Sequence, residues 1–138
     1  MLARTGLDAQ EALVCTMVLI AAADGITDRE IGVMAGIVQT MPVFENFSSD
    51  RLAVATDAAV SLLREEEGLN HAARLIREAL EPRLRETAYA LACEVAAAGR
   101  LASQSALQML EFVKDELELD PLAAAAIERA ARARHQQV

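Results

Sequence analysis

One stretch constrains the fold more than any other: from Ala12 to Ala23 every residue is apolar except Thr16. A helix formed by these residues is apolar on every face, which is typical of a helix that other helices enclose. The run is also too short to cross a bilayer, because a membrane-spanning helix takes about 20 residues. We therefore predict that this segment is the central helix of a folded core.

A polar junction follows the apolar run. The pair Asp24 and Gly25 ends the first helix, and Thr27 and Glu30 follow at the spacing of a capping box. In such a box the threonine hydroxyl and the glutamate carboxylate accept hydrogen bonds from backbone amides at the start of a helix. We predict a second helix that begins after Thr27 and stops before Pro42, so the two helices form a hairpin.

Composition favours a single all-helical domain over residues 1–138. Apolar residues make up 54% of the 138 residues but aromatic residues only 3%, and the abundant Ala and Leu favour helices over strands. Phe44 and Phe47, in the connector after the second helix, are expected to enter the core. Capping and stop signals predict further helices over about 49–66, 70–80, 83–98, 103–117 and 121–134. We predict a compact bundle of six or seven helices.

The chain repeats its own pattern. Residues 17–25 align with residues 91–99 in their apolar register, and after one inserted residue, Arg100, Glu30 aligns with Ser105. The second copy keeps the helix signals but loses the acidic residues. We interpret the repeat as a pseudo-twofold pair of helical hairpins.

The segment AADGITDRE at residues 22–30, the connector at 43–44 and the second hairpin ending at 95–99 resemble the TerB-like tellurite-resistance family. The resemblance covers roughly residues 7–131. It implies an all-helical bacterial domain with a pseudo-twofold pair of Asp-Gly…Glu motifs, a link to tellurite and stress resistance, and a metal cation held by clustered acids.

Carried over residue by residue, the acidic positions of the family match Asp24 and Glu30, with Asp28 beside them. Carboxylates at a tight glycine turn suit a hard divalent cation, Ca²⁺ or Mg²⁺. Three acids from one turn do not fill the coordination shell of either ion. If a cation binds here, we expect Glu94 of the second copy to be the additional ligand.

The same acids also have a purely structural interpretation. Asp24 tolerates the turn, Thr27 and Glu30 cap the second helix, and Asp28 complements the helix dipole. The sequence leaves both interpretations open.

Other classes of function are disfavoured. The chain has two histidines, His71 and His135, and no Ser-His-Asp set, glycine-rich phosphate loop or zinc-ligand cluster is visible, so we expect no enzyme. A net charge of -8 opposes nucleic-acid and membrane-surface binding, and Arg132 and its neighbours suit the end of the last helix. Cys15 and Cys93 lie in apolar runs and are interpreted as buried, reduced thiols of a cytoplasmic protein.

These observations predict a non-catalytic, cytoplasmic binding or scaffolding module with weak divalent cation binding at the acidic helix junction. Its expected partners are proteins, a second copy of the chain among them, and no transmembrane segment is expected. The alternative is a purely protein-interacting helical module, dimeric or not, without a metal site.

Overall fold

The computed structural model describes residues 6–23, 25–98 and 103–138. These residues form seven α-helices and one 3-10 turn, and no strand occurs among them, which confirms the predicted all-helical class. The elements are α1 (Ala9–Ala22), α2 (Asp28–Thr40), η1 (Pro42–Phe44), α3 (Ser49–Leu63), α4 (Gly68–Ala79), α5 (Pro82–Ala98), α6 (Gln104–Glu116) and α7 (Pro121–Arg134).

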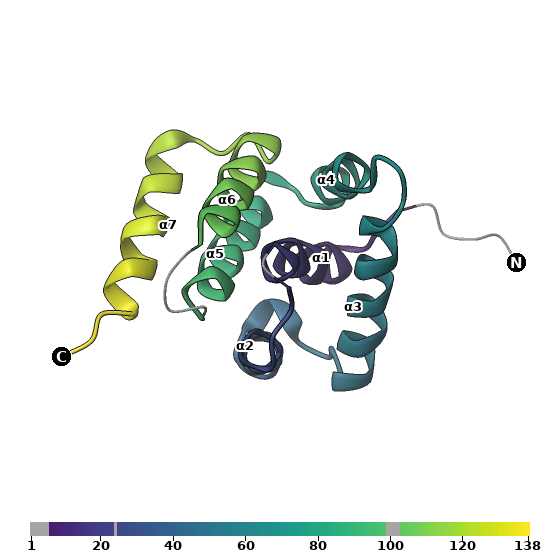
Figure 1. Cartoon of the computed structure of the whole chain (residues 1–138), viewed down its shortest axis with the longest axis horizontal. Coiled ribbons are helices and arrows are strands. Elements are labelled where there is room, and N and C mark those ends of the chain that lie inside the picture. The colour runs from purple at the N-terminus through teal and green to yellow at the C-terminus, as the bar shows by residue number, and fades with distance from the viewer. Residues whose placement is uncertain (1–5, 24, 99–102) are drawn as a thin grey trace, which may run out of the picture.

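Helix α1 lies at the centre of the bundle, where α3, α4, α5 and α6 pack against it (Figure 1). Every residue from Ala12 to Ala21 is buried. The hydroxyl of Thr16 donates to the carbonyl of Ala12 at 2.8 Å, so this buried polar side chain has a partner inside its own helix. Burying each large apolar side chain contributes about 1.5–3 kcal/mol. The prediction of an enclosed first helix is confirmed.

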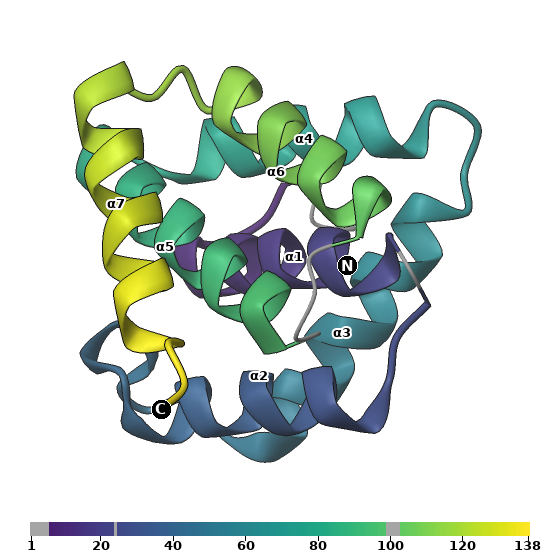
Figure 2. The same ribbon diagram turned by 60° about the vertical axis from the view of Figure 1, so that its left-hand side comes forward.

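Helix α5 is the second organising element, because α1, α2, α6 and α7 all pack against it. Helix α2 also contacts α3, and α6 also contacts α1. Helix α7 runs along one edge of the molecule, beside α5 (Figures 1 and 2). The outer side of α5 is therefore framed by three helices that come from different parts of the chain.

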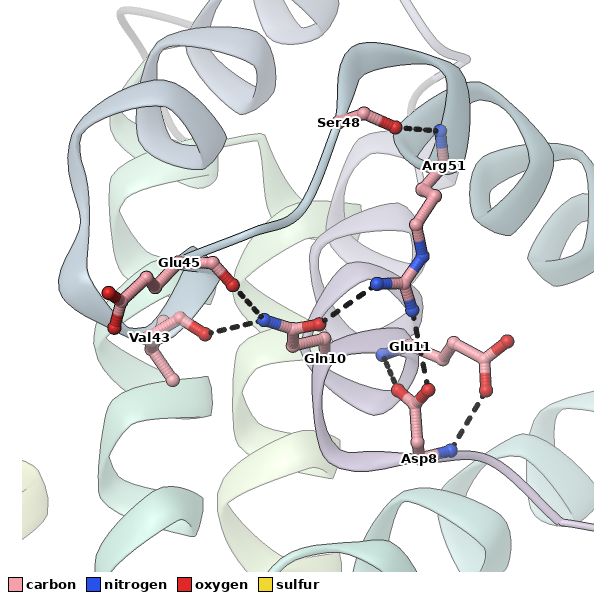
Figure 3. Close-up of polar contacts among 7 residues, drawn as sticks. All are labelled: Asp8, Gln10, Glu11, Val43, Glu45, Ser48 and Arg51. Atoms are coloured by element: carbon pink, nitrogen blue, oxygen red, sulfur yellow. Dashed lines mark hydrogen bonds and ion pairs between the residues drawn. The ribbon is translucent and has the colours of Figure 1, made fainter.

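The N-terminal end of α1 is fastened to the connector and to α3 (Figure 3). The amide nitrogen of Gln10 donates to the carbonyls of Val43 and Glu45, both at 3.1 Å. The guanidinium of Arg51, in α3, lies 3.4 Å from Gln10 Oε1 and 3.5 Å from a carboxylate oxygen of Asp8. These contacts set the position of η1 and α3 relative to the central helix.

Both phenylalanines of the connector enter the core, as predicted. Phe44 and Phe47 are buried, and their ring centroids are 5.3 Å apart. The connector therefore anchors the end of α2 through apolar contacts as well as through the hydrogen bonds of Figure 3.

The corner between α3 and α4 differs from the prediction. Helix α3 ends at Leu63 rather than near Glu66, and α4 begins at Gly68 rather than after Asn70. The left-handed residue at this corner is Glu67, with φ of 58°. A Cβ atom at Gly68 would clash with the backbone carbonyl oxygen of Leu62, in α3. The glycine is therefore required by the close approach of the two helices and does not act as a helix stop.

Candidate functional site

The predicted capping box at the start of α2 is present. The backbone amide of Thr27 donates to a carboxylate oxygen of Glu30 at 3.1 Å, and the amide of Glu30 donates to the Thr27 hydroxyl at 3.4 Å. Glu30 is only 9% exposed. This carboxylate therefore has a structural role in the helix cap.

The other predicted cation ligands do not gather around Glu30 within the described residues. Asp28 is exposed in the first turn of α2, and Asp24 lies outside the residues that the structure describes. Glu94 contacts α7 instead: its two carboxylate oxygens lie 2.7 Å from Arg134 Nε and 2.5 Å from His135 Nε2.

Over residues 6–23, 25–98 and 103–138, no three His, Cys, Asp or Glu side chains are arranged to hold a metal ion. Because Asp24 is not among these residues, the cation site stays a prediction.

A different feature stands out on the outer side of α5. A groove of about 930 Å³ lies between α7, α6 and α2, the helices seen together in Figure 2. Its floor comes from α5 and its apolar wall residues from the other three helices. We call it the α5 groove, and its apolar lining comprises Val33, Tyr89, Cys93, Ala96, Ala97, Ala98, Leu107, Leu110 and Ala131.

The acidic side chains of this groove already have partners within the protein. Tyr89 donates its hydroxyl to Glu128 at 2.5 Å, and Lys114 Nζ lies 3.5 Å from the same carboxylate oxygen. Lys114 also donates to Glu111 at 2.8 Å. Burial, and then the hydrogen bond to Glu128, raises the pKa of Tyr89, so this hydroxyl stays protonated and remains a donor.

The basic side chains at another part of the rim do not pair with carboxylates. Arg29, near the start of α2, and Arg132, in the last turn of α7, are both exposed and both line the groove. Arg29 donates to the carbonyl of Ala98 at 3.4 Å, at the end of α5. Within the described residues neither guanidinium forms an ion pair with a carboxylate. Two cationic groups are therefore available to a ligand.

The thiol of Cys93, in the floor of the groove, is protonated at neutral pH. Burial raises the pKa of Cys93 to about 11, and burial raises the pKa of Cys15, in the central helix, to about 12. Both cysteines are buried and free, as the sequence predicted. Because the thiolate is the nucleophile, Cys93 is a weak nucleophile at neutral pH.

The sequence did not identify this groove, because its residues come from four helices that are separated along the chain. The local signals were weak. The small residues Cys93, Ala96 and Ala97 indicate only a close helix contact, and Arg132 fits the end of a helix on electrostatic grounds alone. His135, which directly follows α7, pairs with Glu94 across the α5–α7 contact.

Comparisons of the chain with protein-family models, with curated proteins and with solved structures find no match. The resemblance to the TerB-like family therefore rests on the sequence motifs. Among the described helices, none combines the length and the apolar composition that a membrane span requires.

Proposed function

We propose that this chain is a non-catalytic binding module and that the α5 groove is its binding site. The observation that carries this proposal is the apolar floor of α5, framed by three other helices in a cavity of about 930 Å³. Sites for small molecules and cofactors are typically apolar concavities of about 300–1,000 Å³ with a few polar groups. The groove has this size, and it combines an apolar floor with polar side chains around it.

The state of the titratable groups favours binding over catalysis. Tyr89 donates its hydroxyl to Glu128, and the raised pKa values of Tyr89 and Cys93 keep both groups protonated. A general base or nucleophile needs a pKa near the working pH and access to substrate. Neither Tyr89 nor Cys93 meets the first of these requirements.

We also propose that the chain has the pseudo-twofold pair of helical hairpins that its resemblance to the TerB-like family implies. Helix α2 packs against α5, and α6 packs against α1, so each predicted hairpin contacts the first helix of the other. This reciprocal packing supports a pseudo-twofold arrangement. The resemblance adds the setting, a scaffolding role in bacterial stress or tellurite resistance in the cytoplasm, with protein partners and with cation binding at the α1–α2 junction as a secondary property.

The proposal is tested by titrating the uncharged apolar dye Nile red into the protein and following its fluorescence. Leu107, in the wall of the groove, is 47% exposed, so Leu107→Asp leaves the core intact but places a charge in the site. We expect this variant to bind the dye at least about tenfold more weakly, a loss of about 1.4 kcal/mol.

Leu122→Asp is the matched control, because Leu122 is 78% exposed on α7 and does not line the groove. This variant should bind the dye as the wild type does. Absence of dye binding by the wild type, or an equal affinity in the two variants, would refute the groove as the binding site.

A further inference from the structure

The charges on the rim of the α5 groove indicate which chemical class of ligand it takes. Building on the proposed function, we infer that the groove binds a free long-chain carboxylate, that is, a fatty acid. Its alkyl chain lies on the α5 floor and its carboxylate lies between Arg29 and Arg132. Neither the capping box of α2 nor the predicted cation site is part of this inference.

The floor accounts for the alkyl chain. Cys93, Ala96 and Ala97 are small, and the side chains of Leu107 and Leu110 add apolar wall surface. An alkyl chain needs no hydrogen-bond partner, so such a surface binds it without leaving an unsatisfied polar group. Each methylene removed from water strengthens binding by about fourfold until the groove is filled.

The two guanidinium groups account for the carboxylate. Arg29 and Arg132 lie on α2 and α7, on different walls of the same groove, and neither pairs with a carboxylate of the described residues. A guanidinium presents parallel N–H donors that match the two oxygens of a carboxylate. Arg29 is also in the first turn of α2, where the helix dipole favours a negative charge.

The acidic groups of the groove set the orientation of the ligand. Glu111 and Glu128 are occupied by Lys114 and Tyr89, so this part of the lining offers no free cation to a carboxylate. The head group is therefore directed to Arg29 and Arg132. A cationic amphiphile, in contrast, would be repelled by these two arginines.

The overall charge favours a free fatty acid over a lipid surface as the source of this chemistry. The chain carries a net charge of -8, which repels an extended anionic membrane. A single carboxylate that enters the groove meets mainly the local field of two arginines. The cavity volume also lies in the range of small ligands, whereas a partner helix would extend well beyond it.

The test is displacement of Nile red by three additives with the same chain length: dodecanoate, dodecan-1-ol and dodecylamine. All are used as monomers below their aggregation concentrations. We expect dodecanoate to displace the dye from the wild type at a concentration about tenfold lower than dodecan-1-ol, with dodecylamine the weakest. In Arg132→Glu and in Arg29→Glu the preference for dodecanoate over dodecan-1-ol should fall to about one.

Arg129→Glu is the matched control, since Arg129 is an exposed arginine of α7 that does not line the groove and the charge change is the same. It should retain the preference for dodecanoate. The inference is overturned if dodecanoate is no better than dodecan-1-ol, or if Arg129→Glu and Arg132→Glu lose the preference equally.

These outcomes separate the two proposals. Dye binding without any preference for the carboxylate would leave the groove as a binding site and refute the fatty-acid inference alone. A peptide rich in Leu and Glu that displaces the dye where dodecanoate fails would assign the groove to a protein partner and also refute it. Lack of dye binding would refute both.

Discussion

Helices α1 and α7 have the same length, 14 residues, but opposite environments. In α1 the residues from Ala12 to Ala21 are all buried, whereas in α7 only Ala124 and Ala131 are. Four helices enclose α1, while α7 packs along α5 at the edge of the molecule (Figure 1). Elements that bind ligands are usually drawn from the less stable parts of a fold. We therefore expect α1 to contribute more to the stability of the fold than α7, and α7 to be the wall of the groove that opens more readily.

The largest expected effect tests this assignment directly. Leu13 in α1 is fully buried, and Leu13→Ala should lower the free energy of unfolding by about 2–5 kcal/mol through lost burial and a cavity. Leu122 in α7 is 78% exposed, and Leu122→Ala should stay within about 0.5 kcal/mol of the wild type. Urea denaturation measures both. Similar losses in the two variants would show that α1 does not carry more of the stability.

The labelling rates of the two cysteines provide a second comparison of α1 with the groove beside α7. The pKa of Cys93, about 11 rather than 9.0, lowers its thiolate fraction at pH 8 by about 100-fold, and labelling by a disulfide reagent should be slowed accordingly. Cys93 should nevertheless react before Cys15, because local opening of α7 exposes the groove floor while Cys15 needs global unfolding.

Labelling is measured in Cys15→Ala and in Cys93→Ala, so that each thiol is followed alone. Equal rates, with the same dependence on urea, would contradict local opening of α7.

The same pKa shift predicts that the contribution of the Cys93 thiol to the free energy of unfolding is fully present below about pH 9 and is lost as the pH rises toward 11, because the folded state holds the thiol proton more tightly.

A smaller effect is expected at the C-terminal end of α7. Glu94 pairs with Arg134 and His135, and its side chain is 24% exposed. Glu94→Gln removes the charge but keeps the shape, so stability should fall by no more than about 1 kcal/mol. Hydrogen exchange should accelerate in the last turn of α7 and stay unchanged in α1. Faster exchange in α1 would mean that the two helices open together.

The smallest effect is expected at the α1–α2 junction. The proposed cation binding at this junction is weak, because Glu30 also serves the helix cap, so millimolar Ca²⁺ or Mg²⁺ should raise the melting temperature by only about 1–3 °C. A rise that disappears in the double variant Asp24→Asn, Glu30→Gln would identify these acids as cation ligands, and no rise in the wild type would refute the cation site. Glu94→Gln then reports whether Glu94 belongs to the same site.

Local signals predicted much of the fold. The apolar run of α1, the Thr27 and Glu30 capping box, and the Asp120-Pro121 start of α7 each act within a few residues, and all three are present. The predicted bounds at the α3–α4 corner were wrong, because Gly68 is required by a close contact with the backbone of the last turn of α3, which the spacing of turn residues does not reveal.

The site was harder to predict, because its residues are far apart along the chain. Arg29 and Arg132 become neighbours of one groove only through the packing of α2 and α7 around α5. The structure describes three of the predicted cation ligands. Glu30 is a cap residue, Asp28 is an exposed residue in the first turn of α2, and Glu94 pairs with the C-terminal end of α7. A motif reveals which groups are close along the chain, whereas ligand sites depend on groups that meet across it.

The contact at Gly68 has a consequence for how the gene can vary. Any side chain at this position would displace the last turn of α3, so a library that samples all amino acids there should return glycine alone among folded clones. The neighbouring Glu67, whose left-handed backbone also suits Asn and Gly, should accept both. We therefore expect position 68 to tolerate no substitution, while position 67 tolerates at least two.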